Sequence, residues 1–189
     1  MASNFRNVTS AQTRPSWDEY FMMAAKLIAV MATCPKLRVG TVIVRNKRIV
    51  ASGFNGAPSG QPHCTEVGCM TFEGEGSSCR RVIHSEHNAV LQNSRDIAGG
   101  SLYTPYLPCI DCMKPIIASG ISEVVYEKEY NGHKPKYQVS KEFASEAGIK
   151  LRRIPEVNIT RLLNNYYPIE EILNVEINEG EREEEILEF

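Results

Sequence analysis

Short β-branched runs alternate with amphipathic stretches along most of this chain. The apolar stretch that begins at Tyr20 follows Ser16, and Glu19 stands three residues after that serine, which is the pattern of a capping box at a helix start. Residues 39–44 and 49–52 are two β-branched runs on either side of a polar turn. Such a pair predicts a β-hairpin directly after the first helix.

Helices and strands also alternate in the second half of the chain. We predict helices over residues 85–95, 109–119 and 140–147, and strands over residues 102–104, 121–126 and 149–154. Gly120 and Gly148 directly follow two of these helices, as glycine commonly does at a helix end. Alternating strands and helices imply a three-layer α/β architecture.

Residues 53–81 interrupt this alternation. They are rich in Gly, Ser and Pro without a sustained period, and a loop of this length is usually functional or cross-linked from within. Beyond residue 154 the chain becomes acidic, which indicates a solvated or frayed tail. We therefore expect an N-terminal segment (1–15), a domain (16–154) with an insertion at about 57–81, and an acidic C-terminal extension (155–189).

Composition narrows the range of partners. A chain of 189 residues with 42% hydrophobic content supports one domain with a proper core. Its net charge of −2 lacks the basic excess of a nucleic-acid binder, and no apolar run reaches the length of a membrane span. Without a secretory signal we expect a cytoplasmic protein, in the host cytoplasm if the chain is viral, with its six cysteines reduced.

Four residues form the pattern H-x-E … P-C-x-x-C: His84, Glu86, Cys109 and Cys112. One imidazole and two thiolates leave the fourth tetrahedral position of Zn²⁺ open for water, whereas a structural zinc uses four protein ligands. His84 and Cys109 begin predicted helices, where N–H groups and the positive dipole end favour thiolates. The pattern predicts a catalytic zinc on His84, Cys109 and Cys112, with Glu86 as an unligated proton shuttle.

Each half of this pattern is unspecific when taken alone. A lone C-x-x-C is more often a structural zinc knuckle or a redox pair, and a lone H-x-E has almost no specificity. Their combination, in this order and with a helix starting at each half, favours catalysis.

The combined pattern is typical of the zinc nucleobase deaminases. From about residue 16 to 154 the chain resembles the deoxycytidylate (dCMP) deaminase family, in the segments R-V-G-T-V-I-V (38–44), S-G-F-N-G-A-P (52–58) and P-H-C-T-E-V-G-C (62–69). The resemblance implies a three-layer α/β/α cytidine deaminase-like fold with a central mixed sheet. It also implies hydrolysis of dCMP to dUMP and ammonia, which supplies dUMP for thymidylate synthesis.

The expected mechanism follows from this resemblance. Zinc lowers the pKa of its bound water to about 7. Glu86 takes the released proton while hydroxide attacks C4 of cytosine, and then protonates N3 and the departing amine.

A second, structural zinc is also implied. The four cysteines outside the catalytic pattern are Cys34, Cys64, Cys69 and Cys79, and His63 stands beside one of them. Similar deaminases often carry a zinc in this insertion, and a loop poor in apolar residues needs such a cross-link to stay ordered. Our hypothesis is a site made by the four cysteines, with His63 as the substitute for one of them. The alternative is four unrelated thiols.

A nucleotide substrate brings a phosphate that needs a cation or several N–H donors. Arg38, Asn55, Lys136 and Tyr137 are our candidates for substrate contact, although a cation on a solvated loop is the plain alternative for each. Family members are commonly homohexamers activated by dCTP and inhibited by dTTP, with Mg²⁺ on the triphosphate. The resemblance therefore suggests an effector surface, for which the candidates are Asn55, Gly56, Arg81, Asn88 and Arg95.

Two positions depart from the family pattern. Ser85 replaces the usual alanine between the metal histidine and the glutamate, and Pro105 removes an N–H ahead of the Pro-Cys pair.

Three other functions compete with dCMP deamination. A deaminase of tRNA or single-stranded DNA would need a basic channel with stacking aromatics. A free-nucleoside or pterin-type deaminase would not need the cysteine-rich insertion. A catalytically silent zinc-binding regulatory subunit would be favoured by loss of the glutamate, yet Glu86 is present.

Overall fold

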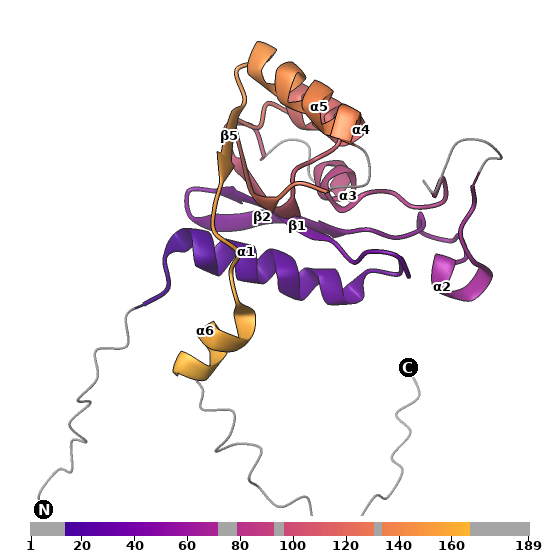
Figure 1. The fold of residues 1–189 in the computed structure, drawn as a ribbon, viewed down its shortest axis with the longest axis horizontal. Helices are drawn as coiled ribbons and strands as arrows, with labels where there is room; N and C mark the ends of the chain where they lie inside the picture. The colour runs from indigo at the N-terminus through magenta and orange to yellow at the C-terminus, as the bar shows by residue number, and fades with distance from the viewer. Residues whose placement is uncertain (1–13, 72–78, 93–96, 131–133, 167–189) are drawn as a thin grey trace, which may run out of the picture. The chain divides into compact units, whose positions relative to one another are not determined.

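A mixed sheet forms the centre of residues 15–157 in the computed structural model (Figure 1). The structure describes residues 14–71, 79–92, 97–130 and 134–166, except for the side chains of 134–136 and 165–166. Its strand order in these residues is β2-β1-β3-β4-β5. β1 runs antiparallel to β2 and β3, whereas β3, β4 and β5 are parallel. The strands are β1 (Gly40–Arg45), β2 (Arg48–Phe54), β3 (Ser101–Tyr106), β4 (Glu123–Lys128) and β5 (Lys150–Arg153).

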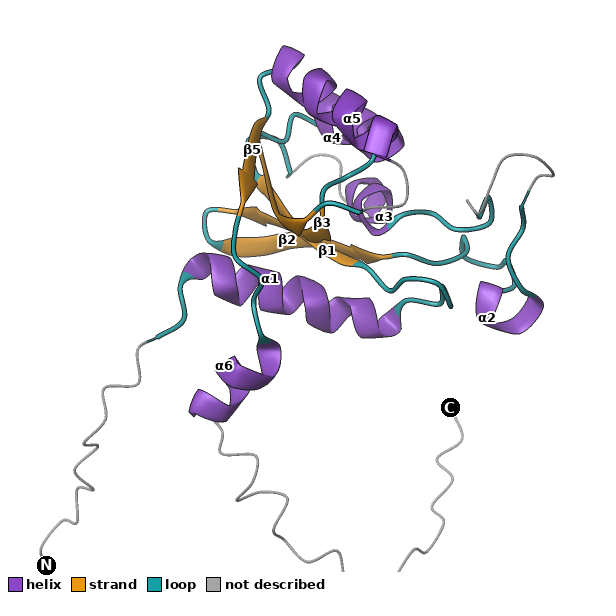
Figure 2. Ribbon diagram, viewed as in Figure 1, coloured by secondary structure: helices purple, strands orange, loops and turns teal. Residues whose placement is uncertain are grey.

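Helices cover both faces of this sheet. Figure 2 shows α1 on one face and α3, α4 and α5 on the other, so the predicted three-layer α/β/α architecture with a mixed sheet is confirmed. The helices of this unit are α1 (Trp17–Ile28), the 3-10 turn η1 (Ala29–Met31), α2 (Cys64–Val67), α3 (Ser85–Gln92), α4 (Ile110–Ala118) and α5 (Lys134–Glu146). Residues 158–189 and 1–14 form a second unit, in which α6 (Ile159–Tyr166) is described. None of the described helices is long and apolar enough to cross a bilayer.

Local sequence signals account for α1 and for the hairpin. The Ser16 hydroxyl accepts a hydrogen bond from the Glu19 amide at 3.2 Å, and the Glu19 carboxylate accepts one from the Ser16 amide at 2.7 Å, which completes the predicted capping box. Asn46 and Lys47 join β1 to β2 with φ of 51° and 59°. Two successive residues with positive φ match the twist of the paired strands.

Three elements differ from the prediction. α5 begins at Lys134 rather than at residue 140, and the short helix α2 lies inside the segment that we expected to be a loop. α6 lies in the part that we expected to be a frayed tail, and residues 167–189 lie outside the described ones. α3 agrees with the prediction as far as it is described, to Gln92, and residues 93–95 of its predicted span lie outside the described residues.

Two glycines let helices approach the sheet closely. A Cβ at Gly40 would lie 2.1 Å from the carbonyl oxygen of Ala25 in α1. A Cβ at Gly53 would lie 2.4 Å from the amide nitrogen of Ala89 and 2.5 Å from the carbonyl oxygen of Ser85, both in α3. Since real Cβ atoms do not approach backbone so closely, only glycine allows these two helices to sit where they do.

The main core lies between the sheet and the helices α3, α4 and α5. Apolar side chains from both layers are almost completely removed from solvent there, which is the dominant favourable contribution to folding. Its buried members are Ile43, Ala51, Ala89, Val90, Ile97, Leu102, Met113, Ile116, Ile121, Val124, Ala144 and Ile149.

Ion pairs join α1 to the far strands of the sheet. The guanidinium of Arg152 in β5 binds both carboxylate oxygens of Asp18 in α1, and its Nε donates to Glu123 in β4 at 3.1 Å. The Tyr103 hydroxyl donates to Asp18 at 2.9 Å. The hydrogen bonds from Arg152 lower the pKa of Asp18. Burial acts to raise the pKa of Glu123, but hydrogen bonds from Arg152 and Lys150 outweigh burial, so this pKa is also lowered.

Candidate active site

His84, Cys109 and Cys112 come together where β3 leads into α4. Their ligand atoms all lie within 4.8 Å of one another, and Nδ1 of His84 is 3.6 Å from Sγ of Cys109 and 3.3 Å from Sγ of Cys112. Bonds of about 2.3 Å to sulfur and about 2.0 Å to nitrogen around a tetrahedral zinc place two such ligands about 3.5 Å apart. The three side chains therefore fit a zinc ion.

Helix starts hold these donors in place. Cys109 is the N-cap of α4, and its carbonyl oxygen accepts hydrogen bonds from the amides of Cys112 at 3.1 Å and Met113 at 2.9 Å. The carbonyl of His84 accepts one from the Asn88 amide at 2.9 Å, at the start of α3. The dipoles of both helices thus point their positive ends at the donor cluster, where they favour thiolates.

The charges of the cluster also call for a cation. The hydrogen bond from Cys112 lowers the pKa of Cys109 to about 4. Burial opposes this lowering, and His84 adds to it. The same hydrogen bond and burial raise the pKa of Cys112 well above its ordinary value. Two adjacent thiols cannot both ionise easily unless a positive ion lies between them, so this donor set suits a divalent metal.

Glu86 lies one residue into α3 and is 6% exposed. Its Oε2 accepts a hydrogen bond from the Ser85 hydroxyl at 3.0 Å and lies 3.8 Å from Sγ of Cys112. Burial raises its pKa, and the charge of His84 opposes that rise. A carboxylate whose pKa is moved toward neutrality is suited to taking up and releasing a proton in turn.

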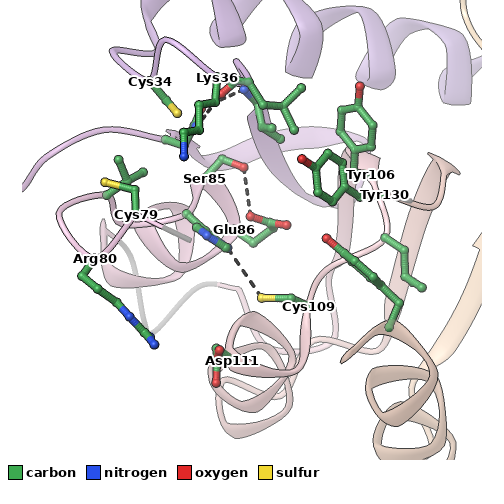
Figure 3. Close-up of a pocket in the computed structure, with 17 residues that line it drawn as sticks. Cys34, Lys36, Cys79, Arg80, Ser85, Glu86, Tyr106, Cys109, Asp111 and Tyr130 are labelled. Atoms are coloured by element: carbon green, nitrogen blue, oxygen red, sulfur yellow. Dashed lines mark hydrogen bonds between the residues drawn. The ribbon is translucent and has the colours of Figure 1, made fainter. Parts of the chain in front are cut away.

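A cavity opens above this cluster, and Figure 3 shows the side chains that line it. Its floor is formed by His84, Glu86 and Cys109, the candidate catalytic groups. Lys36 and Arg80 contribute two cations to its lining. The cavity thus brings two of the predicted metal ligands and the predicted acid together with positive charge, although Lys36 and Arg80 were not predicted.

Three tyrosines form one wall of the cavity. Tyr106 ends β3, Tyr130 follows β4 and Tyr137 lies in α5. The rings of Tyr106 and Tyr130 meet edge to face at 6.2 Å, and those of Tyr130 and Tyr137 at 6.4 Å. Burial, followed by the charge of the nearby Cys109, raises the pKa of Tyr137, so its phenol stays neutral. This wall can contact a flat ring while it offers hydroxyl groups.

A second cysteine cluster lies in the insertion. The sulfur atoms of Cys64, Cys69 and Cys79 are all within 4.8 Å of one another, with Cys64 and Cys79 at 3.6 Å. Two thiolates on a tetrahedral zinc are separated by about 3.8 Å, so these three also fit a metal. Cys34 is not part of that group, and Nδ1 of His63 is 3.1 Å from the Thr33 hydroxyl.

Burial and hydrogen bonding move the pKa values of Cys64 and Cys79 in opposite directions. Burial, with the neighbouring Cys79, raises the pKa of Cys64 to about 11. Burial opposes ionisation at Cys79 as well, but the backbone amides of Arg81 and Met70 donate to its sulfur and lower its pKa. As in the first cluster, one thiol ionises at the expense of its neighbour, which a cation would relieve.

The four residues predicted to contact substrate are placed differently from one another. Tyr137 and Asn55 line the cavity. The Asn55 side chain is already engaged, since it accepts from the Val39 amide and donates to the Leu37 carbonyl, both at 2.8 Å. Arg38 is exposed, donates to the Val30 carbonyl and is not among the described residues that line the cavity. Lys136 lies in α5, and its side chain is outside the described part of the structure.

Three of the predicted effector residues, Asn55, Gly56 and Asn88, lie near the end of β2. Gly56 and Ile83 exchange two backbone hydrogen bonds, and the Asn88 side chain donates to the Phe54 carbonyl at 3.0 Å. Nε of Arg81 is buried and has no hydrogen-bond partner among the described residues. Arg95 lies outside the described residues. Asn55 and Asn88 thus already serve the local backbone of this region.

Comparison with known proteins places these features in a family. The family model for the cytidine and deoxycytidylate deaminase zinc-binding region matches residues 15–128, which include both halves of the metal pattern. ComE operon protein 2 of Bacillus subtilis is 39% identical over 144 residues, which cover 75% of this chain and 72% of that protein.

Two further relatives carry a deaminase name. Deoxycytidylate deaminase of Schizosaccharomyces pombe is 43% identical over 126 residues, which cover 62% of this chain but only 39% of the yeast protein. The crystal structure of dCMP deaminase from the cyanophage S-TIM5, in complex with dCMP and dUMP, matches with a TM-score of 0.62 and 29% identity over 75% of this chain and 99% of that one. On the family match and these relatives, this chain belongs to the zinc-binding cytidine and deoxycytidylate deaminases.

Proposed function

We propose that this protein hydrolyses dCMP to dUMP and ammonia. The observation that carries the proposal is that one cavity is lined by His84 and Cys109 of the zinc-compatible His-Cys-Cys cluster, by the buried acid Glu86 and by two cations. The names of the yeast and cyanophage relatives support the choice of a pyrimidine nucleotide as substrate.

In this proposal His84, Cys109 and Cys112 hold the zinc, and Glu86 moves the protons. When bound, the zinc supplies a water activated for attack at neutral pH. The Glu86 carboxylate would accept one proton of that water and donate it to N3 of cytosine. It would then accept the second proton of the same oxygen, now bonded to C4, and deliver it to the amine, which leaves as ammonia while the oxygen stays on C4. Its raised pKa suits it to both directions of transfer.

The remaining cavity residues would orient the nucleotide. We place the 5′-phosphate at Lys36 and Arg80, which line the cavity, in preference to Arg38, which does not. The tyrosine wall, with Tyr137, would contact the base or the sugar. Asn55 would act through the backbone it holds, because its amide binds both Leu37 and Val39.

A spectroscopic assay tests the reaction. We expect loss of cytosine absorbance and release of ammonia with dCMP, much weaker turnover of CMP and deoxycytidine, and none of a cytosine-containing oligonucleotide. Turnover of the oligonucleotide with none of dCMP would contradict the proposal and favour a nucleic-acid deaminase. Absence of turnover with every substrate in zinc-loaded protein would favour the silent regulatory subunit.

The phosphate contact is tested separately. In Lys36→Ala and Arg80→Ala we expect KM for dCMP to rise about tenfold or more, because each variant removes a charged hydrogen bond to phosphate. Arg38→Ala is the matched control, since it removes an exposed cation outside the cavity lining. Turnover of deoxycytidine, which has no phosphate, should change equally little in all three. A raised KM in Arg38→Ala alone would restore the original assignment.

We also propose a structural zinc at Cys64, Cys69 and Cys79. The fourth ligand would be Cys34 or His63, with the histidine released from Thr33. Two zinc ions per chain in active protein are expected, and one per fully active chain would exclude the site. We place the enzyme in the cytoplasm, where such thiols stay reduced.

Regulation and assembly remain proposals drawn from the family. We propose a homohexamer that is activated by dCTP and inhibited by dTTP, with Mg²⁺ on the triphosphate, and that supplies dUMP for thymidylate synthesis. Asn55, Gly56, Arg81, Asn88 and Arg95 are the candidate effector residues. Sigmoidal dCMP kinetics that become hyperbolic with dCTP would support regulation, and hyperbolic kinetics insensitive to both triphosphates would exclude it. Sedimentation velocity tests the hexamer.

A further inference from the structure

Two buried hydroxyl groups form a chain that ends on the candidate catalytic acid. Oγ1 of Thr41 in β1 lies 2.8 Å from Oγ of Ser85, and Oγ of Ser85 lies 3.0 Å from Oε2 of Glu86. Thr41 and Ser85 are both 0% exposed. The chain therefore runs from the middle of the sheet to the cavity floor, out of contact with solvent.

The direction of these hydrogen bonds follows from counting protons. A serine hydroxyl has a single hydrogen, and a carboxylate can only accept. If Ser85 donates to Glu86, then Thr41 must donate to Ser85. Thr41 thus keeps the Ser85 hydroxyl turned toward the carboxylate rather than free to rotate.

This chain distinguishes the two oxygens of Glu86. Oε2 receives the Ser85 hydroxyl and lies near Sγ of Cys112, whereas no side chain in the described residues donates to Oε1. Figure 3 shows the bond from Ser85 to one carboxylate oxygen, with the other oxygen directed away from Ser85. Among the described side chains, only Ser85 donates a hydroxyl hydrogen bond to this carboxylate, and it does so at Oε2.

The close approach of α3 to the sheet makes this arrangement possible. Gly53 in β2 pairs with Thr41 in β1, and a Cβ at Gly53 would lie 2.5 Å from the carbonyl oxygen of Ser85. Because Gly53 carries no side chain, the first turn of α3 sits directly on the hairpin. Ser85 is thereby brought within hydrogen-bond distance of Thr41.

We propose that Ser85, itself oriented by Thr41, is a positioning residue that fixes the rotamer of the Glu86 carboxylate for proton transfer. The inference rests on the proposed deaminase function and concerns how its acid is held. Without the two hydroxyls, the carboxylate would sample other rotamers, and its reactive oxygen would spend less time within reach of the substrate.

The first experiment compares Ser85→Ala with the wild type. Relatives usually carry alanine at this position, so the effect concerns the way this chain holds its acid. Removal of the hydrogen bond should lower kcat for dCMP by about tenfold. KM for dCMP and the zinc content per chain should stay at wild-type values, because Ser85 is neither a proposed metal ligand nor one of the cations proposed to bind the phosphate. Unchanged kcat in Ser85→Ala would overturn the proposal, as would a fall in kcat that matches a loss of zinc.

Thr41 allows a sharper comparison on a single position. Thr41→Val removes the hydroxyl and keeps the shape, so kcat should fall; Thr41→Ser keeps the hydroxyl and should retain most of the activity. Thr104→Val is the matched control, since Thr104 follows Tyr103, the partner of Val42, and is also 0% exposed. Its hydroxyl has no hydrogen-bond partner among the described residues. This control variant should keep wild-type kcat.

A double-mutant cycle separates positioning from general packing. If Thr41 acts through Ser85, then Thr41→Val should have little further effect on kcat in the Ser85→Ala background. If the fall in kcat of the double variant equalled the product of the two single falls, the proposed chain would be overturned. Equal falls in kcat in Thr41→Val and Thr104→Val would also overturn it. Wild-type turnover of dCMP tests the proposed function by itself. The ratio of variant to wild-type kcat, with whichever cytosine substrate the wild type accepts, tests only the positioning.

Discussion

The two cysteine clusters have similar internal distances but very different supports. His84, Cys109 and Cys112 stand at the starts of α3 and α4, which pack on a five-stranded sheet in the described residues. Cys64, Cys69 and Cys79 stand in the insertion, on the four-residue helix α2 and the segments around it. The first cluster is held by the fold. The second cluster, if metal-bound, would hold its own segment in the fold, which is the usual role of a structural zinc.

The largest expected effect distinguishes a proton shuttle from a structural carboxylate. Glu86→Gln should lower kcat for dCMP by about 10²- to 10⁴-fold, because the amide cannot accept or return a proton. Zinc content should not change. The control is Glu66→Gln in α2, where Glu66 accepts a hydrogen bond from the His63 amide at 3.0 Å; this variant should keep wild-type kcat. Undiminished turnover by Glu86→Gln would refute the catalytic assignment.

Next in size is the loss of one thiol from each cluster. Cys112→Ser should remove the catalytic zinc and nearly all activity, since three protein ligands leave little redundancy. Cys69→Ser should also lose one zinc per chain but keep a measurable fraction of kcat, because its thiol is not among the cavity-lining groups of the described residues. Elemental analysis and turnover on the same samples provide the measurement. Wild-type zinc content in Cys69→Ser would show that the second cluster holds no metal.

Removal of metal should affect the local stability of the clusters unequally. After chelation we expect a protease to cut within residues 57–81 several-fold faster than in the zinc-loaded protein, because the cross-link of that segment is lost. Residues 85–92 and 110–118 should stay protected, since packing on the sheet remains. Mass spectrometry of the first fragments reports the site. If the first cuts fell in α3 or α4, the first cluster would be the one whose segments depend on metal, which would contradict the comparison.

The smallest expected effect concerns how the stability of the sheet that supports the first cluster depends on pH. Arg152 holds the pKa of Asp18, and with Lys150 that of Glu123, below their ordinary values. Their stabilisation is therefore complete above the unfolded-state pKa values of about 4 and is lost as pH falls through the lower folded-state values. In Arg152→Met the free energy of unfolding should therefore depend less on pH in the acid range. At neutral pH it should fall by at most about 1 kcal/mol, since these pairs are partly exposed. Urea unfolding at several pH values measures it.

Local signals predicted much of this molecule. The capping box at Ser16, the hairpin turn at Asn46 and the order of helices and strands are all properties of neighbouring residues, and the structure contains each of them. The placement of His84 and Cys109 at helix starts is equally local. The early start of α5 had a local signal as well, because Pro135 suits the first turn of a helix.

The parts that were missed depend on contacts between distant segments. Lys36 and Arg80 line one cavity although more than forty residues separate them, and the candidates Arg38 and Arg81 stand one or two residues away. Which of two neighbouring side chains faces a cavity depends on backbone direction in a loop, which has no fixed period. The bond between Thr41 and Ser85 depends on how closely a helix packs on a strand, and no pattern within either segment reports that distance.

Gly53 shows how far catalytic demands reach into the scaffold. It has no functional group, yet a single added methyl would collide with the backbone at both Ser85 and Ala89. A mutational scan for activity should therefore score this position among the most intolerant in the chain, next to the metal ligands. In evolutionary terms, even a change to alanine should be eliminated at this site, because the space between the hairpin and the helix that carries Glu86 is too small for one extra carbon atom.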